Sequence, residues 1–363
     1  MRIPIITSIS SALLALVSAM SVQAQAPDST IPHRRIQPLP ALASAPETGF
    51  QFGATVLAVF EPAAASHTRA SSVIASVIRS TKSQTRVAIE GERWTTGNAR
   101  RLYAQIAWQE FPLPYYGTGD NTPESAKEIY SPKGVDIQLA IHQRLRGPVY
   151  AIVSTRVLSQ RMQFDTGGTL QFGNVTGTAA GRVVELTAGA LIDTREHLFA
   201  PRSGTYAQFT YTQSDGAIGS EYRYQRARLD ARRYLTIGAN HVLAAQLLAI
   251  STNGTPPFDQ LALVGGSDIL RGYARGRYRD RVLGAAQLEY RSPILHRIGA
   301  VAFGGAGTVA SKLSDVGSTT VFPTYGAGLR VQIDPRQRTS VRADYGRGRD
   351  GASGLYIGFN QAF

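Results

Sequence analysis

The sequence predicts an all-β fold, specifically a transmembrane antiparallel β-barrel, and three observations support this fold class. Apolar and polar residues alternate along most of the chain after residue 48. Glycine is abundant with 36 residues, and the 16 Tyr and 13 Phe residues far outnumber the 2 Trp residues. After the N-terminal segment, no apolar run reaches the roughly 18 residues that a transmembrane helix needs.

Residues 1–24 have the features of a cleavable signal peptide. Arg2 supplies the positive start, Ser11–Val17 is the apolar run, and Val22-Gln23-Ala24 is a small-residue cleavage site. The apolar run is too short to span a membrane, so we expect export rather than anchoring. Residues 25–48 are rich in Pro, Ala and Ser without periodicity, which predicts a short periplasmic linker before a barrel of residues 49–363.

The alternation has a period of two residues, as in Arg101–Gln109, Gly134–Arg144 and Gly181–Asp193. A period of two gives each strand one apolar and one polar face. The polar faces carry Arg together with Asp or Glu, which favours a barrel with lipid outside and a polar lumen over a soluble sandwich. Closure also removes strand edges, which lipid cannot hydrogen-bond. The residues predicted to face lipid include Val184, Leu186, Ala188, Phe209 and Tyr211.

About fifteen such segments can be distinguished, and single-chain bacterial barrels have an even number of strands. The predicted number is therefore sixteen, with one strand hidden within Phe111–Lys133 or near the first strand. In the last segment, alternation places Leu355, Ile357, Phe359 and Phe363 on the lipid face. Terminal aromatic residues are typical of barrels delivered to the assembly machinery, so Phe359 and Phe363 are predicted to be the assembly signal.

Composition and motifs exclude several classes of function. The chain has no Cys, which rules out disulfides, thiolate metal sites, Cys nucleophiles and lipoprotein acylation. The formal charge is +13, but Arg is spread along the chain at polar positions, so nucleic acid is not a predicted partner. The 6 His residues lack metal-ligand spacing, and neither a Gly-x-Ser-x-Gly elbow nor a phosphate loop is present. We therefore predict no metal, no cofactor and no enzyme activity.

The most distinctive segment is Leu263–Tyr278, a long loop between two strand-like segments. Gly265 and Gly266 stand at its start, and Arg271-Gly272-Tyr273 at its centre. An ordinary flexible surface loop is the alternative interpretation, since an Arg-Gly-Tyr triplet is weak by itself.

The residues that follow strengthen the motif. Glu289 lies at an inward position of Gly284–Ser292, and Phe303–Gly307, GAGLRVQIDP and RADYG come next. This order resembles the barrel domain of the BamA/TamA superfamily, also called the bacterial surface antigen family. The resemblance covers most of the mature chain and includes Pro46–Gly49 and the Asp193-Thr194-Arg195 turn.

The resemblance implies that the loop folds back into the lumen and that Arg271 contacts acidic residues on the inner wall. By position, Glu289 is the first partner. The second acidic position of the family falls at Gly305, so Arg271 is held either by Glu289 alone or by Asp344 as well. The physics agrees, because a guanidinium in a narrow lumen needs a carboxylate, and Gly272 lets the backbone pass close to the wall.

The resemblance also implies a Gram-negative outer-membrane protein involved in assembly or translocation of protein or lipid. Large assembly members of the family carry periplasmic substrate-binding domains, whereas Gln25–Glu47 stands in that place here, which suggests a barrel-only member. Implied partners are outer-membrane lipid, the barrel assembly machinery during biogenesis, and a separate periplasmic protein or further copies of the chain. Two alternatives remain: a membrane-embedded hydrolase, and a passive channel that favours anions through Arg226, Arg228, Arg232 and Arg342.

Overall fold

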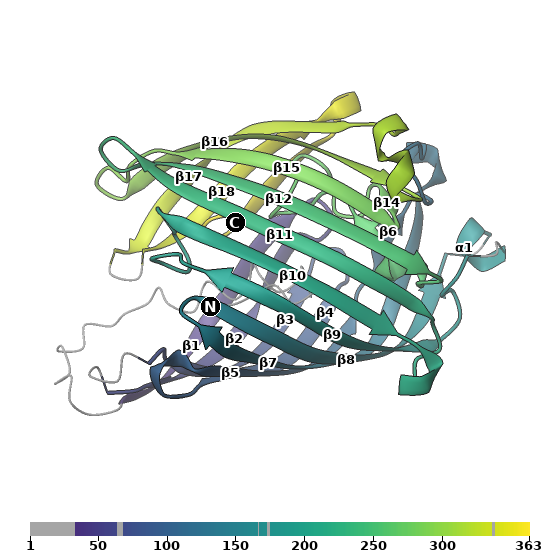
Figure 1. Cartoon of the computed structure of the whole chain (residues 1–363). Coiled ribbons are helices and arrows are strands. Elements are labelled where there is room, and N and C mark those ends of the chain that lie inside the picture. The colour runs from purple at the N-terminus through teal and green to yellow at the C-terminus, as the bar shows by residue number, and fades with distance from the viewer. Residues whose placement is uncertain (1–32, 64–67, 166, 173–174, 336–337) are drawn as a thin grey trace.

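The computed structural model describes residues 33–363 apart from 64–67, 166, 173–174 and 336–337. The predicted signal peptide of residues 1–24 lies outside the described residues, as do residues 25–32. Figure 1 shows long, tilted strands that wrap around one lumen. Within the described part of the chain, no helix is long and apolar enough to cross a membrane.

Sixteen strands close into one antiparallel barrel, in which each strand pairs with its neighbours in sequence and β1 meets β19. The predicted fold class and strand number are therefore confirmed. The strands of the wall are β1 (His33–Ala45), β2 (Gly49–Glu61), β3 (Ser71–Ser80), β4 (Thr85–Trp94), β5 (Arg100–Glu110), β7 (Glu128–Arg146), β8 (Val149–Phe164), β9 (Gly181–Asp193), β10 (Gly204–Ser214), β11 (Tyr224–Ile237), β12 (His241–Gly254), β15 (Val282–Arg291), β16 (Ile298–Ala310), β17 (Phe322–Asp334), β18 (Thr339–Gly348) and β19 (Ser353–Phe359).

Smaller elements occupy the connections. Strand β6 (Leu113–Tyr115) pairs with the start of β7, and β13 (Ala262–Leu263) pairs with β14 (Arg279–Asp280) as a separate hairpin. Helix α1 (Thr169–Phe172) lies between β8 and β9. The remaining short segments are 3-10 helices at Thr96–Asn98, Glu124–Ala126, Gly216–Ile218, Phe258–Gln260, Leu313–Ser318 and Arg349–Gly351.

The barrel begins earlier in the sequence than the expected boundary at residue 49. Residues 33–45 fall in the predicted linker of residues 25–48, yet they form β1 and pair with β2 from His33 opposite Glu61 to Ala45 opposite Gly49. The missing sixteenth segment is thus near the first strand, which was one of the two expected places. It was hidden because Pro38 and Pro40 stand at its outward positions, and Pro is disfavoured within sheets except at edges.

The two faces of the wall differ in polarity as predicted. Leu186, Phe209 and Tyr211 are 47%, 50% and 49% exposed on the outside, and Val184 and Ala188 share their phase. On the inside, charged and amide side chains are buried, among them Glu185, Gln208, Asp230, Gln246 and Arg330. The interior is therefore polar and the exterior apolar, the arrangement that a bilayer imposes on a barrel.

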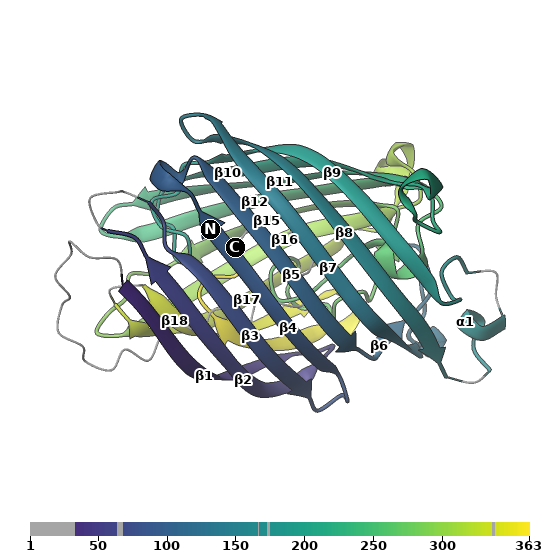
Figure 2. The same cartoon turned by 90° about the horizontal axis from the view of Figure 1, so that it is seen from below.

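The two ends of the barrel differ in the length of their connections. Long segments at residues 111–127, 255–281 and 311–321 lie at one end, and short turns such as residues 147–148 and 238–240 lie at the other (Figure 2). Bacterial barrels have longer extracellular loops and short periplasmic turns. This assigns the long-loop end to the cell exterior.

The position of the C-terminal Phe363 differs from the expected lipid face. Strand β19 ends at Phe359, and Asn360 has a positive φ of 58°, which turns the chain inward. Phe363 is 5% exposed and therefore lies inside the barrel with Tyr234, and its backbone oxygen accepts a hydrogen bond of 2.7 Å from Arg291 Nη2. Phe363 does not share the lipid face, because the period of two cannot be extended past a residue with positive φ. Phe359 stays in phase with the outer face and packs against neighbouring apolar side chains.

Candidate functional site: a loop folded into the lumen

Residues 255–281, which we call the inner loop, connect β12 and β15 and fold back into the barrel. The β13–β14 hairpin closes the base of the inner loop. Beyond it, Val264, Leu270 and Tyr273 pack with Leu283 and Phe322 of the wall in one buried apolar cluster. The segment is therefore a packed part of the interior and not a flexible surface loop.

Glycine is required where the inner loop passes close to other backbone. Gly272 has a φ of 122°, and a Cβ there would lie 2.6 Å from the carbonyl carbon of Arg347 in β18. From the opposite side, a Cβ on Gly346 would lie 2.5 Å from the carbonyl oxygen of Arg271. Gly265 and Gly266 also have positive φ, at 87° and 126°, where the loop turns.

Arg271 lies between two carboxylates on different strands. Its Nη2 is 2.5 Å from Glu289 Oε2 on β15, and its Nη1 is 2.6 Å from Asp344 Oδ2 on β18. All three side chains are fully buried, and the guanidinium carbon lies 3.6 Å from the centre of the Phe303 ring. Of the two arrangements left open by the sequence, the structure has both carboxylates in contact with Arg271.

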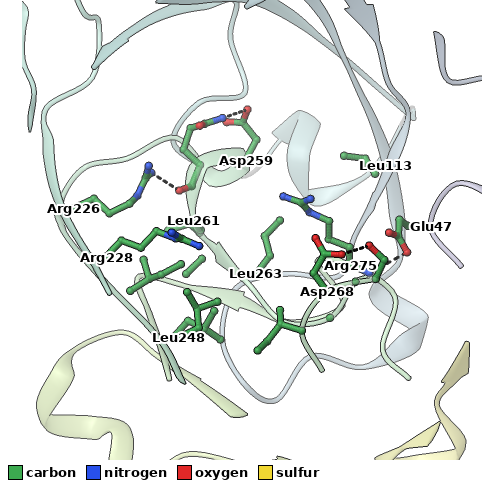
Figure 3. Close-up of a pocket in the computed structure, with 18 of the residues that line it drawn as sticks. Glu47, Leu113, Arg226, Arg228, Leu248, Asp259, Leu261, Leu263, Asp268 and Arg275 are labelled. Carbon is green, nitrogen blue, oxygen red and sulfur yellow. Dashed lines mark hydrogen bonds between the residues drawn. The ribbon is translucent and has the colours of Figure 1, made fainter. Parts of the chain in front are cut away.

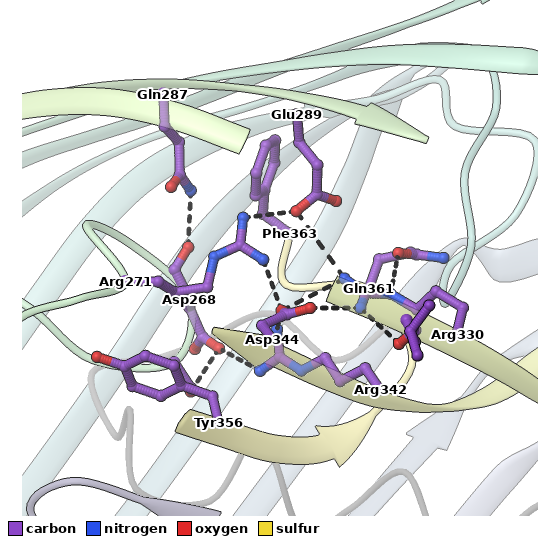
Figure 4. Close-up of polar contacts among 12 residues, drawn as sticks. Asp268, Arg271, Gln287, Glu289, Arg330, Arg342, Asp344, Tyr356, Gln361 and Phe363 are labelled. Atoms are coloured by element: carbon purple, nitrogen blue, oxygen red, sulfur yellow. Dashed lines mark hydrogen bonds and ion pairs between the residues drawn. The ribbon is translucent and has the colours of Figure 1, made fainter. Parts of the chain in front are cut away.

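Further arginines surround the same two carboxylates (Figure 4). Arg291 Nε donates to Glu289 Oε1 at 2.8 Å, and Arg330 Nη1 donates to Asp344 Oδ1 at 2.5 Å. Arg342 lies 3.7 Å from Asp344 and 3.4 Å from Asp268 of the inner loop. We call Arg271, Glu289, Asp344 and these three arginines the Arg271 cluster. Because each carboxylate contacts more than one cation, the burial of both carboxylates is compensated within the cluster.

The backbone of the inner loop is also hydrogen-bonded to the wall. Gly272 N donates to the Tyr356 hydroxyl at 3.0 Å, and that hydroxyl donates to the Tyr273 carbonyl at 2.9 Å. Thr324 Oγ1 donates to the Arg271 carbonyl. The Tyr273 hydroxyl in turn donates to the Pro323 carbonyl at 2.9 Å. These bonds attach the Arg-Gly-Tyr motif to β17 and β19 in addition to β15 and β18.

The sequence pointed to Arg271, Glu289 and Asp344, but it did not single out Arg330, Thr324 or Tyr356 as partners of the motif. Each of these stands at an inward position of its strand, which was the available signal. Periodicity alone shows that a side chain enters the lumen and cannot say what meets it there.

On its other side, the inner loop reaches the opposite wall. Arg156 Nη1 on β8 donates to Gln260 Oε1 at 2.9 Å, and Arg277 Nη1 donates to Thr122 Oγ1 at 3.0 Å in the loop before β7. Arg275 N donates to Glu47 Oε2 at 3.4 Å, in the turn between β1 and β2. The inner loop thus crosses the lumen from wall to wall.

The chemistry of the Arg271 cluster is ion pairing and hydrogen bonding. No group of three or more His, Asp or Glu side chains in the described residues is arranged to hold a metal ion. The arrangement fixes the inner loop against β15–β19.

Comparisons with known proteins agree with this architecture. The family profile described as the Omp85 superfamily domain matches residues 69–363. By structure, the chain is similar to BamA from Haemophilus ducreyi lacking POTRA domains 1-3, with a TM-score of 0.61 and 13% identity over 91% of this chain and 70% of that one. It is also similar to CdiB from Acinetobacter baumannii, with a TM-score of 0.57 and 12% identity over 91% of this chain and 65% of that one. Among the curated proteins compared by sequence, none matches the chain.

Proposed function

This chain belongs to the Omp85 superfamily, and from that premise we propose that it inserts proteins into the outer membrane or translocates them across it. Its substrate would pass at the contact between β1 and β19, which we call the seam. The fold places the chain in the Gram-negative outer membrane. Any periplasmic partner that delivers the substrate belongs to the proposal.

The seam is the observation that carries this proposal. The register between β1 and β19 consists of Ser44 opposite Ile357, whereas β1 pairs with β2 along its whole length. Pro38 and Pro40 on β1 have no N–H to donate, which is typical of edge strands. With a net contribution of about 0.5–1.5 kcal/mol for each hydrogen bond, so short a ladder opens at low cost compared with any other strand pair.

The inner loop determines which side of the seam can move. It is bonded to β15, β17, β18 and β19 through the Arg271 cluster, Thr324 and Tyr356. Toward β1, its hydrogen bond within the described part of the chain is the long contact of 3.4 Å with Glu47 in the β1–β2 turn. Opening would therefore displace β1 and β2 while β19 stays in place.

A disulfide across the seam tests the proposal, and the chain has no Cys to interfere. Ser44→Cys with Ile357→Cys places the two thiols at opposed Cα positions. Leu247→Cys with Ala286→Cys, opposed on β12 and β15, is the matched control. The readout is the folding of an outer-membrane protein substrate into liposomes that contain the purified protein.

We expect oxidation of the seam pair to abolish substrate folding and dithiothreitol to restore it, with the control pair active in both states. An oxidised seam pair that is as active as the control would reject the seam as the path. A protein that is inactive in every form would reject the insertase function itself.

A further inference from the structure

A second feature of the lumen lies away from the Arg271 cluster. Between the inner loop and the wall formed by β7, β8, β11 and β12 is a cavity of about 260 Å³ (Figure 3). One ordered water needs about 10–15 Å³ of such volume, so the cavity holds far more than a single water. We call it the loop cavity.

Some of the arginines that line the loop cavity are fully neutralised. Arg156 donates to both oxygens of Asp136, each at 3.0 Å. Arg232 donates to both oxygens of Asp230, at 2.9 and 2.8 Å. Both pairs are bidentate, so Arg156 and Arg232 each have a full counter-charge.

Three other arginines on the lining have donors to spare. Arg86 on β4 is only 5% exposed, and it makes no hydrogen bond or ion pair within the described part of the chain. The guanidinium of Arg275 is likewise unbonded among the described residues, with Nη1 buried. Arg228 donates one hydrogen bond of 3.1 Å to Asp230, and the same carboxylate also accepts from Arg232. Figure 3 shows Arg228 and Arg275 entering the cavity from opposite sides.

The carboxylates on the lining accept hydrogen bonds from other donors, and none of these bonds comes from Arg86 or from the guanidinium of Arg275. Asp259 Oδ2 accepts from Gln160 and Gln260, at 2.6 and 2.8 Å, while its Oδ1 is buried without a hydrogen bond in the described part of the chain. Asp268 accepts from Ser267 and Arg342, and Glu47 accepts from the backbone of Arg275. Arg86 is buried and Arg228 and Arg275 are partly buried, and their unused donors face a cavity with a restricted supply of water, so the loop cavity is suited to an anion from outside the chain.

The rest of the lining is apolar. Leucines from the loop before β7, from β12 and from the inner loop face the same space as the guanidiniums, at Leu113, Leu248, Leu261 and Leu263. We propose that the loop cavity binds an organic anion, a phosphate monoester or carboxylate with a short aliphatic chain. Arg86, Arg228 and Arg275 bind its charged group, and the leucines surround its chain. This site is independent of the seam and of insertase activity.

Calorimetry on the purified full chain in a non-ionic detergent tests the site. The probes are octyl phosphate, inorganic phosphate, and octyltrimethylammonium, which has the same tail and the opposite charge. The variants are Arg86→Gln and Arg275→Gln. Arg161→Gln is the matched control, because Arg161 lies on the same barrel wall but is exposed on the outside of β8.

We expect octyl phosphate to bind at least tenfold more tightly than inorganic phosphate, and octyltrimethylammonium not to bind. Each of the two variants should raise the dissociation constant for octyl phosphate tenfold or more, and Arg161→Gln should leave it unchanged. Equal binding of the two octyl probes, or of octyl phosphate to all variants, would overturn the proposal. Inorganic phosphate that binds as tightly as octyl phosphate would identify a free-phosphate site and overturn the role of the leucines.

A second measurement needs no variant. Octyl phosphate should protect Arg228 and Arg275 of the wild-type protein from modification by phenylglyoxal, as mapped by mass spectrometry, while Arg161 reacts at an unchanged rate. Unprotected Arg228 and Arg275 under saturating octyl phosphate would contradict the assignment even if a variant failed to fold.

Discussion

Replacing Arg271 with Ala removes the cation that lies between Glu289 and Asp344. Each of these two buried carboxylates then has one positively charged partner fewer. Breaking a buried ion pair by deleting one partner costs about 3–5 kcal/mol. Here Glu289 keeps Arg291 at 2.8 Å and Asp344 keeps Arg330 at 2.5 Å, so neither carboxylate is stranded. We therefore expect the low end of that range, a loss of about 3 kcal/mol in the free energy of unfolding.

The loss can be measured by urea unfolding in detergent, followed by the shift in electrophoretic mobility between folded and unfolded barrel. Arg271→Lys should be nearly as damaging, because an ammonium is a point charge and cannot bridge two carboxylates as a planar guanidinium does. Arg161→Ala, at an exposed outward position, should stay within about 0.5 kcal/mol of the wild type.

A double-mutant cycle isolates the pair. Arg271→Ala and Glu289→Ala each break the same contact of 2.5 Å, so the double variant should cost less than the sum of the two, with a coupling of about 0.5–3 kcal/mol. Strict additivity would refute the reasoning. So would labelling of Arg271 by an impermeant arginine reagent on intact cells at the rate of Arg161, since a buried guanidinium is protected.

Four further outcomes can be measured on the same protein. Gly346→Ala should lower the melting temperature, because its Cβ would lie 2.5 Å from the Arg271 carbonyl oxygen. Gly284→Ala, whose Cβ would meet no atom within 4 Å, should leave the melting temperature unchanged. Equal melting temperatures of the two variants would contradict the close approach at Gly346. In planar bilayers, deletion of residues 263–279 should raise a low wild-type conductance, and a large wild-type conductance would favour the passive channel instead. Phe363→Ala should cost about 3 kcal/mol, because the ring packs inside the barrel against Tyr234, and wild-type stability would argue that the C-terminus is not docked. Burial raises the pKa of Glu196, but hydrogen bonds from the backbone N–H groups of Arg202 and Ser203 outweigh it, so the pKa lies below its usual value. The carboxylate form of Glu196 therefore stabilises the turn at residues 194–203 fully above the ordinary glutamate pKa, and this stabilisation is lost as pH falls through the lowered pKa. The protection of the turn from hydrogen exchange, corrected for the pH dependence of the intrinsic rate, should fall in acid, and Glu196→Gln should abolish this fall.

The strands could be predicted from sequence because the bilayer imposes a simple rule on each of them. Leu186 and Phe209 face outward with polar neighbours inward, as period two requires. The rule failed where other constraints act on the backbone. Because of Pro38 and Pro40, the segment that forms β1 was interpreted as a linker. The positive φ of Asn360 directs Phe363 into the lumen and not toward the expected lipid face. The role of Phe359 and Phe363 as an assembly signal stays a prediction.

The contacts of the Arg271 cluster could be predicted only in part, because the sequence does not show the path of the inner loop. Family resemblance pointed to Arg271 and Glu289, and the inward phase of Asp344 made it a candidate. Which inward side chains meet depends on the path of the inner loop, and a loop has no periodicity from which its path can be inferred. Tyr356 and Thr324 contact the motif because backbone approaches backbone at Gly272 and Gly346, a contact that becomes visible only in three dimensions.

The distribution of bonds around the barrel is uneven in a way that bears on function. Between β15 and β19, each wall strand except β16 forms an ion pair or a hydrogen bond with the Arg-Gly-Tyr motif, and β16 contributes Phe303 to the guanidinium. The β1–β2 side has a short seam and, among the described residues, one hydrogen bond of 3.4 Å to the inner loop. Local stability within a folded protein follows such differences in bonding, and segments with few bonds open first. The proposed function requires the wall to open at β1 without releasing the loop that crosses the lumen, and this distribution of bonds is compatible with both requirements.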